Sequence, residues 1–237
     1  MSTNKSFLAL MFDSPLMSWG GSSRFRRRLT LLNPTRGAIS GMICAALGAD
    51  RGSKVEEEWL QRLFKMKLKV MAIPRLHSYD KKRKLPVVRL NDFQTVGAGY
   101  DKDDPWQKDM MVHNAEGKPR ESGIKHRQYL ANAQFGVLME GDSDHLRIIG
   151  EALQNPCWGL WFGCKSCIPS SPIFRGLKPT LKEALECLEL SEDEADKLSS
   201  VSDVDSFSEG NDTVMDVPLN FKTRSFSSRR ILRKHST

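Results

Sequence analysis

Apolar residues recur along the first third of the chain with the periods of strands and of helices. Residues 6–12 (SFLALMF) form an apolar run with the length of a buried strand. Residues 35–47 and 55–64 carry apolar side chains at helical spacing, which predicts two amphipathic helices. Residues 67–73 (KLKVMAI) alternate charged and apolar side chains, as a half-buried strand does. This order of strand, helices and strand predicts an α+β fold with a ferredoxin-like, RRM-like core.

Further patterned segments follow residue 127. Residues 128–139 alternate again and predict a central strand, 144–153 and 181–190 predict helices, and 214–219 predicts an edge strand. Residues 191–211 are acidic and serine-rich with few large apolar side chains, so we expect a flexible excursion there.

The loop before the first helix concentrates positive charge. Gly20 and Gly21 allow a sharp turn after the strand. Pro34 disfavours helical geometry at Asn33, so the helix begins at about Thr35, a good N-cap. The N-terminus of this helix offers free N–H groups and partial positive charge, which suits a phosphate. The loop contributes the arginines Arg24, Arg26, Arg27, Arg28 and Arg36. It is either a site for a polyanion or a solvated arginine-rich turn before an ordinary packing helix.

The overall charge points in the same direction as this loop. The 237 residues carry a formal net charge of +7, which favours an acidic partner such as a nucleic acid. The acidic stretch 183–216 masks an even more basic remainder. The cationic tail 222–234 either contacts RNA or is a solvated, disordered end. No apolar run approaches the roughly 20 residues that span a bilayer, and no secretory cleavage pattern is present, so we expect a cytoplasmic protein without membrane contact.

The cysteines do not predict a metal site. Without export signals, the five cysteines are expected to be reduced thiols. Cys164 and Cys167 form a single CxxC pair, and Cys157 is the only other cysteine nearby. A structural zinc site needs a second ligand pair at suitable spacing. We therefore predict no metal and no cofactor, and expect the CxxC pair to be incidental.

Residues 157–176 form a second informative stretch. Its glycines and prolines predict a loop whose backbone can approach another chain closely. Lys165, Ser166 and Arg175 add donors for phosphate groups, which would position a nucleic acid without reading its sequence.

Several residues now combine into a resemblance. The first set consists of Ser18, Trp19, Gly20, Arg28, Thr30, Pro34, Thr35, Arg36, Gly41, Leu47 and Gly48. In this order and spacing they resemble the start of the CRISPR-associated protein 5 family, most of all its type I-E branch. A YL-x-A-x-F motif of the family is matched by Tyr129, Leu130, Ala133 and Phe135. A G-x-[RK]-S-C-P-like loop is matched by Gly163, Lys165, Ser166 and Cys167, with departures at Cys164 and Ile168.

The resemblance implies a domain organisation. It implies a RAMP-type ferredoxin-like core in residues 1–180, with a thumb-like insertion at about 78–127, and a smaller β-rich C-terminal part in 181–237 that carries the acidic segment and the basic tail. Residues 90–96 (LNDFQTV) resemble a segment of the family's thumb, which rests on guide RNA. Phe93 is therefore expected to stack against bases, the alternative being a plain core residue.

The resemblance also implies a function. It implies a non-catalytic RNA-binding subunit of a Cascade surveillance complex in antiviral defence, which caps the 5′ handle of the CRISPR RNA. Such a subunit contacts the large subunit and a backbone subunit, and helps present the guide for pairing with target DNA. We expect Arg28, Arg36, Lys165 and Arg175 to contact phosphates. The full set of expected RNA-binding residues is Trp19, Gly20, Arg24, Arg26, Arg27, Arg28, Thr30, Thr35, Arg36, Phe93, Lys165, Ser166, Arg175 and Arg229.

An endoribonuclease is the alternative function. Metal-independent RNA cleavage needs a general base and a general acid near one phosphate. Lys125 and His126 are residues of the kinds with which a type I-C relative cleaves precursor RNA; otherwise they simply precede a strand at the surface. Further candidates are His77, Tyr79, Asp92, Tyr100 and His113. The similarity to type I-E, where a separate subunit processes the RNA, favours a protein that only binds.

Overall fold

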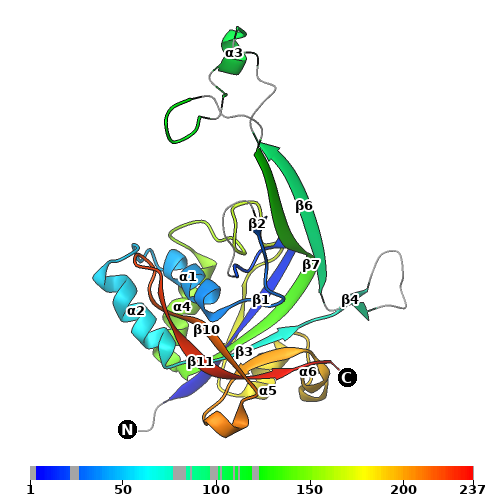
Figure 1. Cartoon of the computed structure of the whole chain (residues 1–237). Coiled ribbons are helices and arrows are strands. Elements are labelled where there is room, and N and C mark those ends of the chain that lie inside the picture. The colour runs from blue at the N-terminus through cyan, green and yellow to red at the C-terminus, as the bar shows by residue number, and fades with distance from the viewer. Residues whose placement is uncertain are drawn as a thin grey trace.

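A large, mostly antiparallel sheet runs through the molecule, and helices pack on both of its faces (Figure 1). The computed structural model describes residues 4–21, 27–76, 84–85, 87–96, 101, 103–108, 110–111, 113–118 and 123–236. The main path of the sheet follows the order β10 (Asp212–Asn220), β11 (Ser225–Lys234), β9 (Ser200–Asp203), β3 (Lys67–Ala72), β7 (Gly123–Asp142), β1 (Lys5–Met17) and β8 (Phe174–Lys178).

The central strands and three helices make a ferredoxin-like core. Along the chain, β1 is followed by α1 (Arg36–Ala46), α2 (Lys54–Phe64), β3, β7, α4 (Ser143–Gln154) and β8. In the sheet these strands lie in the order β8, β1, β7, β3, and each neighbouring pair is antiparallel. This is the split βαβ arrangement of the ferredoxin-like fold. The predictions of an α+β fold, of both early helices and of a central strand at 128–139 are confirmed.

β1 is buried on both faces. Successive side chains of a strand point to opposite sides, and each side of β1 is covered by a hydrophobic core. Leu8, Leu10 and Phe12 pack into the larger core, which α1, α2 and α4 cover. Ala9 and Met11 pack into a smaller core on the other face, with residues of α5 (Leu181–Glu186) and α6 (Glu192–Lys197). Burial on both sides explains why this strand reads as a continuous apolar run.

No helix in the described part of the chain is long and apolar enough to cross a membrane.

A two-stranded arm projects from the sheet (Figure 1). It consists of β6 (Val88–Val96), which pairs with residues 123–131 of β7, and α3 (Pro105–Lys108) lies near its tip. β2 (Arg27–Arg28) runs parallel to β7 along its other edge. At Asn132, directly after the residues that pair with β6, the backbone of β7 takes a left-handed conformation with φ of 50°. The segment expected as a thumb-like insertion is thus built around an extended strand pair.

Separately, β4 (Arg75–Leu76) pairs with β5 (Lys84–Leu85) in a small antiparallel sheet.

Residues 191–211 are folded, so the expectation of a flexible excursion was wrong. Ser191 and Glu194 form a capping box at the start of α6, and Ala195 is buried. β9 pairs with both β3 and β11, and a 3₁₀ helix follows at Phe207–Glu209. The acidic side chains of α6 are exposed to solvent while Ala195 between them is buried, and composition alone does not reveal this difference.

The C-terminal tail is also part of the sheet. β10 confirms the edge strand expected at 214–219. β11 pairs with β9 and β10, so the alternative of a disordered end for residues 222–234 was wrong.

The irregular segment between α4 and β8 is docked on the end of β1. The backbone N–H of Ser18 donates to the carbonyl oxygen of Phe162 at 2.9 Å. The ring of Phe162, fully buried, packs against Phe12 and Trp19. Gly163 has φ of 97°, and a Cβ atom there would lie 1.6 Å from the carbonyl oxygen of Ser18. The close backbone approach expected of this glycine-bearing loop therefore occurs within the chain itself.

We expect Gly163→Ala to lower the free energy of unfolding by more than about 3 kcal/mol, because the added methyl group overlaps the backbone of Ser18. Gly117 is the matched control, since it also has positive φ, 75°, but has open space where a methyl group would be added. Gly117→Ala should cost only about 1 kcal/mol, the strain of a left-handed alanine. Urea unfolding followed by tryptophan fluorescence measures both values. Equal losses would contradict tight docking of the loop on β1.

Candidate nucleic-acid interface

A broad, open groove with a volume of about 1770 Å³ lies beside α1. Its walls come from residues 18–21 after β1, the segment 28–35, α1 itself, the loop 157–165 and the β10–β11 hairpin. Gly37 and Gly41 in α1 allow this hairpin to pack closely, since Phe226 lies against the first glycine and Phe221 against the second.

The groove presents positive charge. Its exposed basic residues are Arg28, Arg51, Arg89, Lys165 and Arg224. Its acidic residues are Glu56 and Asp216, and both are engaged within the protein. The Glu56 carboxylate is buried and accepts a hydrogen bond from the backbone N–H of Gly52, and Asp216 binds Arg229. Unopposed cations along a groove attract the phosphates of a nucleic acid.

Two exposed tryptophans line the same groove. Trp158 and Trp161 are 42% and 40% exposed, and the ammonium group of Lys165 lies 5.8 Å from the ring centroid of Trp161. Exposed aromatic rings beside cations can stack on nucleobases. Neither tryptophan was among the residues predicted to bind RNA. Two tryptophans within the glycine-containing segment 157–163 could have indicated such a role from the sequence.

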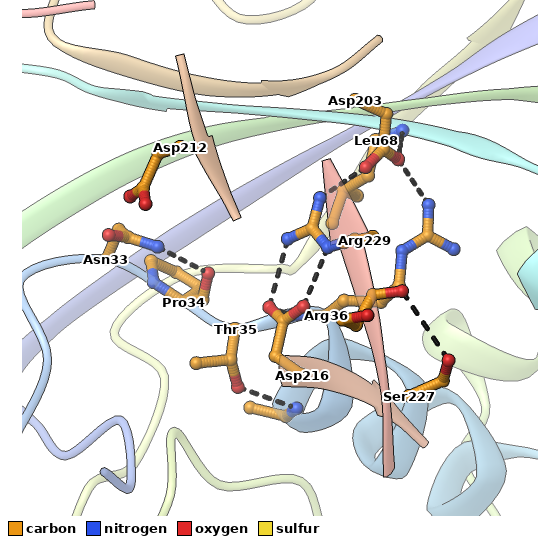
Figure 2. Close-up of polar contacts among 12 residues, drawn as sticks. Asn33, Pro34, Thr35, Arg36, Leu68, Asp203, Asp212, Asp216, Ser227 and Arg229 are labelled. Carbon is orange, nitrogen blue, oxygen red and sulfur yellow. Dashed lines mark hydrogen bonds and ion pairs between the residues drawn. The ribbon is translucent and has the colours of Figure 1, made fainter. Parts of the chain in front are cut away.

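Arg36 does not reach a phosphate, which corrects our expectation. Its guanidinium group is buried, with 8% of the side chain exposed, and forms an ion pair with Asp203 (Figure 2). Its Nη1 donates to the carbonyl oxygen of Leu63 at 2.8 Å, and its Nη2 donates to that of Met66 at 2.7 Å. These carbonyls lie at the C-terminal end of α2, where backbone acceptors lack helical partners and a cation is stabilising. Arg36 thus joins α1 to α2.

Arg229 lies at the wall of the groove but is largely buried in the same network, with 11% of its side chain exposed, so its guanidinium group is bound by carboxylates instead of the expected RNA phosphate. Its Nε and Nη2 donate to the two carboxylate oxygens of Asp216 at 2.7 and 2.9 Å, and its Nη1 donates to Asp203 (Figure 2). Asp216 also accepts a hydrogen bond from the backbone N–H of Arg36 at 2.8 Å. The anion at the N-terminus of α1, predicted to be a phosphate, is therefore the carboxylate of Asp216.

The pKa values reflect this pairing. Burial alone would raise the pKa of Asp216, but the hydrogen bonds and charge of Arg229, with the backbone N–H of Arg36, lower it below its ordinary value. Burial alone would lower the pKa of Arg229, and its two aspartate partners raise it instead. Both groups are held in their charged forms.

The residues around Trp19 support the groove from beneath. Trp19 is 2% exposed, and its backbone N–H donates to the hydroxyl oxygen of Thr30 at 2.8 Å. Thr30 is equally buried, so neither side chain can touch a nucleic acid, contrary to our expectation. Thr35 is the N-cap of α1, as predicted, and its hydroxyl accepts a hydrogen bond from the backbone N–H of Ala38. Gly20 and Thr35 both line the groove.

Arg27, Arg28 and Phe93 lie on exposed parts of the strands beside β7. Arg27 and Arg28 are adjacent in β2 and point to opposite faces, and only Arg28 lines the groove. Phe93 on β6 is 59% exposed, so the alternative of a plain core residue was wrong. Its ring meets that of His126 edge-on, with centroids 5.4 Å apart.

The other predicted residues divide between the groove and the rest of the surface. Lys165 and Ser166 are exposed, and Lys165 lines the groove. Arg175 lies on β8, at the opposite end of the sheet from β10, and donates to the hydroxyl of Ser171 instead of lining the groove. Arg24 and Arg26 lie outside the described residues. Within the described ranges, no group of three or more His, Cys, Asp or Glu side chains could hold a metal ion.

A comparison with protein families identifies the family of this chain, and two solved structures resemble it. A family model described as CRISPR-associated protein (Cas_Cas5) matches residues 7–233. The structure is similar to a chain of a CRISPR RNA-guided surveillance complex, with a TM-score of 0.67 and 26% sequence identity over 97% of this chain and 90% of that one. It is also similar to a protein whose structure is described as that of a Cas protein, with a TM-score of 0.59 and 25% identity over 96% of this chain and 93% of the other. A search of curated protein sequences found no match.

We expect Arg36→Met to lower the free energy of unfolding by about 3 kcal/mol or more, since it leaves buried acceptors at the end of α2 and a buried carboxylate with one partner fewer. The matched control is Arg147→Met, which breaks an exposed ion pair with Glu151 and should cost less than about 1 kcal/mol. Urea unfolding measures both variants. Similar costs would show that the buried network contributes no more than a surface pair.

Proposed function

The chain belongs to the CRISPR-associated Cas5 family, and from this we propose that it is a CRISPR RNA-binding subunit of an RNA-guided surveillance complex. Its similarity over nearly the whole chain to a component of a CRISPR RNA-guided surveillance complex supports the proposal. Its expected partners are the guide RNA and other subunits of such a complex.

The observation that carries the proposal is the basic groove beside α1. Arg28, Arg51, Arg89 and Lys165 are exposed along it, while both acidic side chains at its surface are engaged inside the protein. Contacts from arginine and lysine to phosphates position a nucleic acid without reading its bases. Such contacts suit a subunit that holds a guide whose sequence is read by base pairing.

Aromatic side chains supply the second kind of contact. Trp161, with Lys165 over its ring, would stack on a base within the groove. Phe93 would stack on a base at the arm, where its ring is exposed beside His126. RNA that passes from the groove to the arm would then be held through both phosphates and bases.

We further propose the type I-E branch of the family, whose member is called CasD, and a place at the 5′ handle of the guide RNA. The segment from Ser18 to Gly48 supports this assignment through its resemblance to that branch. In this role the protein contacts the large subunit and a backbone subunit, and helps present the guide to target DNA in the cytoplasm.

The proposed subunit is not catalytic. Lys125 and His126 are neighbours in β7, so their side chains point to opposite faces of the strand, which supports a binding role over joint acid–base catalysis at one phosphate. Of the other candidates, His77, Tyr79 and Tyr100 lie outside the described residues. A metal-independent endoribonuclease of the type I-C kind is the competing function, and exposed His126 is the residue on which it would depend.

We expect Arg28→Ala to weaken binding of a single-stranded RNA that carries the 5′ handle of the host's CRISPR repeat. It should also flatten the slope of log K against log salt concentration by about one unit or less, because one phosphate contact is lost. Fluorescence anisotropy over a series of salt concentrations gives both quantities. An unrelated RNA of equal length should bind more weakly if the protein caps this handle.

Arg175→Ala is the matched control for this measurement. Arg175 is an exposed arginine of the same chemistry, but it lies outside the groove. Its replacement should leave the salt slope unchanged. If Arg175→Ala flattens the slope and Arg28→Ala does not, RNA binds elsewhere and the groove is not the interface.

The enzymatic alternative makes a separate prediction. Incubated with labelled full-length repeat RNA and EDTA, the purified protein should leave the RNA intact on a denaturing gel while still binding it. A specific cut that is lost in His126→Ala would establish the endoribonuclease instead.

A further inference from the structure

Two thiols face each other at the edge of the groove. The Sγ atoms of Cys164 and Cys167 are 3.2 Å apart. The backbone N–H of Cys167 donates to the carbonyl oxygen of Cys164 at 2.8 Å, so the two cysteines occupy the ends of a tight turn. A disulfide bond is about 2.05 Å long, so bond formation needs only about 1 Å of further approach.

The surrounding backbone holds this turn in place. The carbonyl oxygen of Cys167 accepts a hydrogen bond from the backbone N–H of Phe162. The carbonyl oxygen of Phe162 in turn accepts one from the backbone N–H of Ser18, the residue that follows β1. Gly163, directly before the first cysteine, is packed against Ser18. The fold thus keeps both sulfur atoms together, whereas an unfolded chain would have to bring them together at random.

The two thiols differ in exposure and in acidity. Cys164 is half-buried, while Cys167 is fully buried. Burial alone would raise the pKa of Cys164, but hydrogen bonds with Ser166 and Cys167, together with the charge of Arg127, lower it. Burial raises the pKa of Cys167 to about 12. The thiol that solvent can reach is therefore also the one that ionises more readily.

We propose that Cys164 and Cys167 form a redox-active dithiol that closes reversibly to a disulfide by exchange with a small-molecule disulfide such as oxidised glutathione. In the first step the Cys164 thiolate attacks one glutathione sulfur, a mixed disulfide forms, and one glutathione thiolate leaves. In the second step the Cys167 sulfur, having lost its proton to solvent, attacks Cys164 Sγ and releases the second glutathione thiolate. The protein loses two electrons, and oxidised glutathione is reduced to two thiols once these take up the protons.

This proposal replaces the expectation that the CxxC pair is incidental, and it does not rest on RNA binding. A soft metal ion is not favoured at the pair, because in the described part of the chain no third cysteine, histidine or carboxylate joins it.

The test uses the full-length native protein in buffers with graded ratios of reduced to oxidised glutathione. After acid quenching and alkylation, trypsin cuts after Lys165, so a disulfide between Cys164 and Cys167 appears in mass spectra as two linked peptides. We expect this disulfide as the main product, reversible with dithiothreitol. Its equilibrium constant should be at least about tenfold larger for the native protein than for the chain unfolded in urea, because the fold holds the sulfur atoms together.

Two variants complete the experiment. Cys187→Ser removes a thiol outside the loop and should leave the equilibrium constant unchanged. Cys164→Ser should abolish the linked peptides. Equal equilibrium constants in the native and unfolded chains would overturn the proposal. So would glutathione adducts on Cys164 that do not go on to form the disulfide with Cys167. The comparison of native and unfolded wild-type protein gives this answer without any variant.

Discussion

Mutual neutralisation of four buried charges is the constraint on which the rest of the structure depends. Arg36, Asp203, Arg229 and Asp216 alternate in sign, and each has at least one oppositely charged partner within the network. An isolated charge in such a place would cost several kcal/mol, so the network forms only when all its members are in position. These four residues come from α1, β9, β10 and β11. The first helix and the C-terminal strands must therefore take their places together.

This network separates two classes of arginine that look alike in the sequence. Arg36 and Arg229 are bound by carboxylates and carbonyls inside the protein, whereas Arg28 and its neighbours in the groove face solvent. The acidic segment accordingly has a structural task, because its residue Asp203 neutralises two interior cations. The exposed basic residues of the groove take no part in this network.

Local chemistry made much of the fold predictable. The apolar run in residues 6–12 and the alternation in residues 128–139 indicated the central strands, and the capping signal at Thr35 indicated the start of α1. Strand patterns and helix caps are set by residues that are close together in the sequence. The motifs that resemble the family are likewise local in the sequence.

Tertiary contacts limited what the sequence could reveal about the site. Arg28 and Arg36 belong to the same basic loop, and only the position of Asp203, far along the chain, decides that one is buried. Residues 191–211 looked flexible because the composition of a segment does not show which side chains face the core. In the structure Ala195 and Val201 are buried, whereas Asp196 between them is exposed. The exposure of Trp158 and Trp161 depends likewise on how their loop docks on β1.

One residue in β7 marks the base of the arm. Asn132 takes a left-handed conformation, which asparagine tolerates better than most side chains, at the point where β7 leaves the core and becomes the stalk of the arm. Each additional pair of residues, one in β6 and one in β7, would carry the tip outward by about 3.3 Å and rotate it with the twist of the strand pair. The arm is thus a spacer of adjustable reach, whose length can change while the groove at its foot keeps its geometry.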